Sequence, residues 1–116
     1  MRPINKKLLA DILSDPYYKQ RCLTGTFVGK IDLHHAWIYS RKQIDEKWNI
    51  LPIVEKKHSP MGDPDSVHRS AKTDARVKLI ALNRATKEDL AKYPKKNWMM
   101  EKIRLEFEIK NAKRSI

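Results

Sequence analysis

Residues 22–58 read CLTGTFVGKIDLHHAWIYSRKQIDEKWNILPIVEKKH. The expected fold depends on this stretch more than on any other part of the chain. Three of the protein's four histidines lie in it: His34, His35 and His58. Asn49 stands directly before an apolar run, Ile50–Val54. Imidazole is the commonest metal ligand among protein side chains, so this stretch contains a candidate metal site.

The segments of this stretch are typical of short strands joined by loops. Gly25 and Gly29 bracket a short β-rich segment, which predicts a hairpin. The next strand carries His34 and His35. Because adjacent residues of a regular strand point to opposite faces, these two histidines cannot both face one cation. We therefore expect them to have separate functions.

The order of these residues resembles that of the HNH endonucleases. The matching features are the pair His34-His35, Asn49 opening Asn-Ile-Leu-Pro-Ile, and His58 nine positions after the asparagine. Within that superfamily, HHAWIYSRKQIDEKW looks most like small single-domain proteins of bacteriophages and prophages. The resemblance covers about residues 22–68. It implies an α+β fold built on a ββα-metal (HNH, or His-Me) finger, with flanking helices on the N- and C-terminal sides.

The resemblance also implies a function for each matching residue. His34 and His58 would be metal ligands, His35 the general base that activates water, and Asn49 a clamp that bonds backbone across the long loop. Colicin-type sites place another histidine four residues after the one matching His58, and this chain has glycine there. The resemblance therefore implies a two-histidine site. His68 is a candidate third ligand, and the alternative is a histidine on the surface of a helix.

The metal expected at this site is a single divalent ion. Mg²⁺ prefers oxygen ligands, whereas imidazole suits Ni²⁺, Zn²⁺, Co²⁺ and Mn²⁺ to different extents. The resemblance favours Mg²⁺ or Mn²⁺ for activity, with Zn²⁺ or Ni²⁺ as further bound species.

The charge of the chain indicates a polyanionic partner. Its 116 residues carry 25 Lys and Arg against 14 Asp and Glu, a formal net charge of +11. Such an excess favours DNA as the partner. Four basic residues near the matching region are candidate phosphate contacts: Arg41, Lys42, Lys57 and Arg69. The alternative for Arg41 and Lys42 is an ordinary solvated loop.

Two further features limit the class of protein. No run of about 18 apolar residues is present, so we expect no membrane span and a cytoplasmic protein, in the bacterial host cytoplasm if a phage encodes it. Cys22 is the only cysteine, which excludes an intrachain disulfide and a four-cysteine zinc knuckle.

The flanks are expected to be helical within a single domain, residues 1–116. Apolar periodicity predicts an N-terminal helix, Pro3–Leu13, and a helical C-terminal part over about residues 66–113. In the latter, Asp63 or Asp65 would cap a helix over 66–84, Thr86 would cap a short helix, and a last helix would cover 96–113. The connection 36–48 is expected to be a polar loop whose apolar residues form its own small core.

The function implied by the resemblance is that of a metal-dependent DNA endonuclease. It would hydrolyse phosphodiester bonds by a one-metal mechanism and nick DNA with low sequence specificity. The alternative is a non-catalytic or regulatory DNA-binding protein that retains the finger as a scaffold. One finger per chain favours a monomer; a dimer through the apolar residues between 98 and 109 is the alternative.

Overall fold

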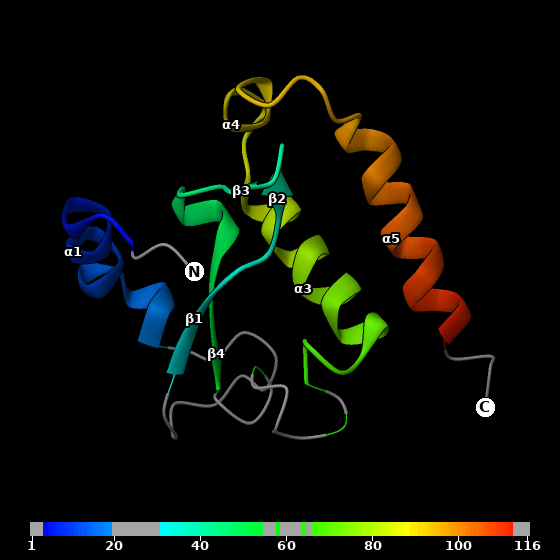
Figure 1. Ribbon diagram of the computed structural model, residues 1–116, viewed down its shortest axis with the longest axis horizontal. Coiled ribbons are helices and arrows are strands. Elements are labelled where there is room, and N and C mark those ends of the chain that lie inside the picture. Colours follow the sequence, from blue (N-terminus) through cyan, green and yellow to red (C-terminus); the bar gives the residue numbers. More distant parts are fainter. Residues whose placement is uncertain (1–3, 20–30, 55–57, 59–63, 65, 113–116) are drawn as a thin grey trace.

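The computed structural model of the protein describes residues 4–19, 31–54, 58, 64 and 66–112. In this part of the chain, helices are combined with two small antiparallel sheets, in agreement with the expected α+β class (Figure 1). The hairpin expected around Gly25 and Gly29 lies outside the described residues. No helix within the described ranges has both the length and the apolar character needed to cross a membrane.

The N-terminal helix is shorter than expected. α1 (Lys6–Ser14) begins after Asn5, whose side-chain oxygen accepts hydrogen bonds from two backbone N–H groups of the first turn. It is followed by the 3-10 helix η1 (Pro16–Lys19). Ile12 is buried, but Leu13, expected in the same apolar stripe, is 71% exposed. The helix therefore buries a narrower face than its sequence predicts.

The larger described sheet places the histidine pair. β1 (Ile31–His35) runs antiparallel to β4 (Ile50–Val54), with His34 opposite Leu51 and His35 opposite Ile50. Both predicted strands are confirmed. Among the described residues β4 pairs with β1 alone, which suits a strand whose central residue is a proline without a donor.

The connection between these strands is more ordered than a plain loop. It contains a small hairpin of β2 (Ile38–Tyr39) and β3 (Lys42–Gln43), then the 3-10 helix η2 (Lys47–Asn49). Its turn residues Ser40 and Arg41 both have positive φ, 50° and 66°. The buried side chains of this connection belong to the main core, together with residues of α3 and α5, and so do not form a separate small core.

Three helices follow the strands: α3 (Ala71–Arg84), α4 (Lys87–Ala91) and α5 (Trp98–Ala112). The expected capping box of α4 is confirmed. The start of α3 at residue 66 was wrong, because Ser70 is its N-cap and accepts a hydrogen bond from the Thr73 N–H. Residues 66–69 form a turn instead, and this moves their side chains off the helix.

The last helix packs along α3 and leaves much of its apolar surface exposed. α3 lies between α5 and the β1–β4 sheet in Figure 1. Leu105 is buried at 1% exposure, and the Trp98 ring meets the Trp37 ring edge-on with centroids 5.2 Å apart. Ile103 and Phe107 are 54% and 65% exposed. Only part of the expected apolar face is therefore in the core.

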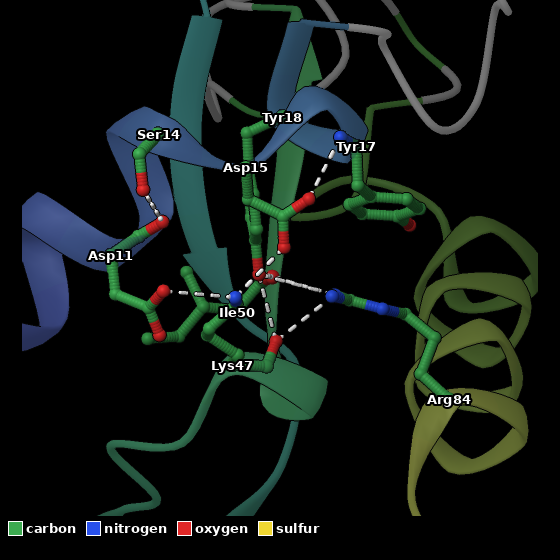
Figure 2. Close-up of polar contacts among 8 residues, drawn as sticks. All are labelled: Asp11, Ser14, Asp15, Tyr17, Tyr18, Lys47, Ile50 and Arg84. Atoms are coloured by element: carbon green, nitrogen blue, oxygen red, sulfur yellow. Dashed lines mark hydrogen bonds and ion pairs between the residues drawn. The ribbon is translucent and has the colours of Figure 1, made fainter.

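A polar cluster ties the N-terminal segment to the strands and α3 (Figure 2). Arg84 Nη1 donates to the carbonyl oxygens of Lys47 and Ile50 at 2.9 and 3.1 Å. The Tyr18 hydroxyl lies 2.8 and 2.7 Å from the same two oxygens. The guanidinium also lies 3.9 Å from the centroid of the Tyr17 ring. Arg84 thus contacts three separate segments from the end of α3.

We expect the substitution Arg84→Met to lower the free energy of unfolding by about 2–3 kcal/mol, because two carbonyl groups would lose charge-assisted donors. Urea denaturation measures this change. Arg76→Met is the matched control, since Arg76 is exposed on the same helix. The control should change stability by less than about 0.5 kcal/mol. Equal losses in the two variants would show that the cluster does not stabilise the fold.

Candidate metal centre and adjacent histidine

Three histidines from separate parts of the chain come together beside β1. His34 lies on β1, His58 follows β4, and His68 lies in the turn before α3. Each offers a ring nitrogen, and these atoms all lie within 4.8 Å of one another. The Nε2 atoms of His58 and His68 are 3.3 Å apart, close to the roughly 3.3 Å that separates two nitrogen ligands of tetrahedral Zn²⁺. The three histidines are close enough to hold one metal ion.

The third histidine enters this group because of where α3 begins. His68 is exposed, as expected for the alternative of a surface histidine, but it is not on a helix. Its ring centroid lies 4.8 Å from that of His58 and 5.5 Å from that of His34. The structure therefore gathers three histidines where the resemblance implies a two-histidine site.

The burial of His34 favours the neutral imidazole, which is the form that binds metals. Its side chain is only 6% exposed, and neither ring nitrogen has a hydrogen-bond partner among the described residues. Burial, followed by the positive charge that His58 and His68 can carry, lowers the pKa of His34 to about 3. The ring is therefore neutral at pH 7. A buried imidazole without partners is unfavourable, and coordination of a cation would satisfy it, so the donor set fits a metal.

A carboxylate orients the second histidine. His58 Nδ1 lies 2.9 Å from Asp32 Oδ2, so the proton is held on Nδ1 and the Nε2 lone pair faces the cluster. Such a carboxylate–histidine pair is the usual outer support of a metal-binding imidazole. Sequence reasoning did not identify Asp32. The available signal was its spacing, because residues 32 and 34 lie on the same face of a strand.

His35 lies outside the three-histidine group, as the alternation of side chains along a strand predicts. Its Nε2 is 3.0 Å from Asp45 Oδ1, which also accepts a hydrogen bond from Gln43 Nε2 at 3.0 Å. Its Nδ1 is buried and has no hydrogen-bond partner among the described residues. The carboxylate holds the proton on Nε2, which leaves Nδ1 as a base. Asp45 lies in irregular chain, where the sequence carries no signal for this contact.

Asn49 forms the bonding pattern expected of a loop clamp. It is fully buried, and its Oδ1 accepts a hydrogen bond from the Trp37 N–H at 2.7 Å. Its Nδ2 donates to the carbonyl oxygens of Trp37 and Ile44, both at 3.0 Å. These bonds fix both ends of the connection that separates His35 from Asp45. Whether Asn49 serves catalysis stays a prediction.

The expected phosphate contacts that the structure describes are exposed and do not line the cavity beside the histidines. Arg41 and Lys42 are exposed at the β2–β3 hairpin, and Arg69 is exposed next to His68. None of these three lines the cavity beside the histidines. Lys57 lies outside the described residues. The basic residues that do line the cavity come from the helical part, which sequence reasoning missed because they are distant in the chain: Lys78, Lys96 and Arg104.

Comparison of the chain with protein-family models, with curated proteins and with solved structures gives no match. What the site can do is therefore inferred from its own side chains. A group of three imidazoles can bind a divalent cation, and a separate imidazole beside it can accept a proton.

Proposed function

We propose that this protein is a metal-dependent DNA endonuclease that hydrolyses phosphodiester bonds by a one-metal mechanism, with its site in a ββα-metal finger of the HNH type. The observation that carries the proposal is the three-histidine group with the separately held His35 beside it. The antiparallel pair β1–β4 and the helical conformation of His58 support the finger. The net charge of +11 supports DNA as the substrate.

In this proposal the three histidines hold one divalent cation. A divalent cation there supplies positive charge that stabilises the phosphate and the leaving O3′ in the transition state. His34 contributes because its lowered pKa keeps it neutral, and Asp32 fixes the ring of His58. Mg²⁺ and Mn²⁺ are the proposed ions for activity, while an all-imidazole set also suits Zn²⁺ and Ni²⁺.

His35 acts as the general base of this mechanism. Its Nδ1 takes a proton from the attacking water, and the ring becomes an imidazolium. Asp45 stabilises that positive charge through Nε2 and holds the ring in the tautomer that leaves Nδ1 able to accept. Asp45 is thus a positioning residue, and Asn49 fixes the connection on which it stands.

We expect Asp45→Asn to reduce kcat about 100-fold, because an amide can donate to Nε2 and so favour the tautomer with the proton on Nδ1. Glu88→Gln, an exposed change of equal charge on α4, is the control. Loss of activity with an unchanged His35 tautomer by ¹⁵N NMR would contradict this positioning role.

Supercoiled plasmid DNA is the direct test of the proposed activity. The protein should convert it to open circles in the presence of Mg²⁺ or Mn²⁺ and leave it intact in EDTA. As each chain offers one site, open circles should accumulate before linear DNA if the protein acts as a monomer. Binding should weaken steeply with salt, because each phosphate contact contributes about 0.9 to the slope of log K against log salt. If supercoiled plasmid and circular single-stranded DNA both stayed intact with every metal, the proposal would be overturned.

A non-catalytic DNA-binding protein is the second candidate. It is favoured by the positive charge, since exposed groups such as Arg41 and Lys42 can contact phosphates without any catalysis. Retention of plasmid DNA on the protein, together with the absence of open circles at all metals, would support this candidate.

A further inference from the structure

A cavity of about 540 Å³ adjoins the candidate metal centre. His34, His35 and His68 line it, together with residues of the β1–β2 connection, α3 and α5. This volume is in the range of small-molecule sites, roughly 300–1,000 Å³. A space of this size is large enough for one nucleotide.

Two of the lysines that line this cavity lie near the Trp37 ring. Lys78 Nζ lies 5.4 Å and Lys96 Nζ 5.7 Å from the ring centroid, and both residues line the cavity. Lys78 is paired with Asp74 at 3.0 Å. No carboxylate of the described residues forms an ion pair with Lys96. The Trp37 indole is itself fixed, since its Nε1 donates to the Lys78 carbonyl oxygen at 3.0 Å.

Like Lys78, the third cationic group of the cavity is already paired with carboxylates. Arg104 Nη2 lies 2.8 Å from Glu101 and its Nη1 lies 2.8 Å from Glu108. An added anion would therefore be attracted chiefly to Lys96, because Lys78 and Arg104 are both paired with carboxylates. The ammonium group of Lys96 is a donor suited to a phosphate oxygen.

The remaining surface of the cavity suits a nucleobase. Ile38 presents an apolar side chain that is 61% exposed, and the His68 ring offers an aromatic surface. Gln43 and Glu101 add polar groups that can bond the edge of a base. Flat aromatic ligands with polar edges bind in such mixed environments.

We infer that this cavity takes one unpaired nucleotide next to the phosphate at the histidines, with the adjoining phosphate held by Lys96. The preferred substrate is then a strand that is single-stranded or has an extruded nucleotide, and not a continuous duplex, because extrusion from a duplex costs a few kcal/mol. The inference rests on the proposed function for the place of cleavage. Binding of the nucleotide does not require cleavage.

The test is a binding measurement in EDTA with the intact protein, a fluorescent single-stranded oligothymidine and a hairpin duplex of equal charge. Lys96→Ala should weaken binding of the single strand about fivefold to tenfold. Lys95→Ala is the matched control: it removes the same charge from the neighbouring exposed residue, which does not line the cavity. The control should change the affinity less than twofold, and the two variants should bind the duplex equally.

Equal losses for the single strand in the two variants would overturn the inference, since they would indicate only general charge. Tighter binding of the duplex than of the single strand at the same salt would also overturn it. These outcomes are independent of cleavage. A loss of single-strand affinity in Lys96→Ala alone, without nicking of DNA in the presence of any metal, would support the nucleotide site and contradict the proposed nuclease function. Nicking of DNA without that loss of affinity would support the nuclease function and contradict the nucleotide site.

Discussion

His35→Ala is expected to lower the rate of DNA cleavage by about 10³-fold, within the range for removal of a general base. Metal affinity and DNA affinity should change less than twofold, because His35 is not part of the three-histidine group. Single-turnover cleavage with saturating protein measures the chemical step. Calorimetric titration with Mn²⁺ measures metal affinity in the same preparation.

The matched variants are His34→Ala, His58→Ala and His68→Ala. Each removes one imidazole of the group and should weaken Mn²⁺ binding by at least tenfold, with cleavage lost in proportion at limiting metal. Thermal unfolding of every variant checks that the fold is intact. Loss of metal binding in His35→Ala with the fold retained would show that the functions of His34 and His35 are exchanged.

The second large effect concerns stability. Asn49→Ala should lower the free energy of unfolding by about 3–5 kcal/mol, because the Trp37 N–H and the Trp37 and Ile44 carbonyl groups lose their buried partner. That loss is a large part of the 5–15 kcal/mol typical of a domain. Urea denaturation monitored by tryptophan fluorescence measures it.

Asn83→Ala is the control for this change, since Asn83 is an exposed asparagine on α3. It should be neutral to within about 0.5 kcal/mol. If Asn49→Ala kept full stability and lost only cleavage, the clamp would not be structural, and Asn49 would act directly in the reaction.

The sequence predicted the elements whose signals are local. Ile50–Val54 is an apolar run and forms β4. Thr86 and Asp89 form the predicted capping box of α4. The alternation of side chains along a strand predicted that His34 and His35 have different surroundings. In the structure His34 belongs to the three-histidine group and His35 contacts Asp45. Each of these depends on neighbours within a few residues.

The sequence did not predict features that depend on choices between competing local signals. The sequence predicted Asp63 or Asp65 as the cap of this helix, and the use of Ser70 instead places His68 in a turn beside His58. The apolar residues of α5 surround the helix, so their spacing could not show that Leu105 is buried and Phe107 exposed. Lys78 and Lys96 each lie near Trp37 only because of tertiary packing.

The turn of the β2–β3 hairpin has a consequence for protein engineering. Left-handed backbone at Ser40 and Arg41 costs about 1–2 kcal/mol per residue for ordinary side chains, and two-residue hairpin turns of this kind favour Asn-Gly. The double substitution Ser40→Asn, Arg41→Gly should therefore make the protein more stable while it removes an exposed cation. Any loss of DNA affinity in that variant could not result from unfolding, and would measure the contribution of the arginine alone.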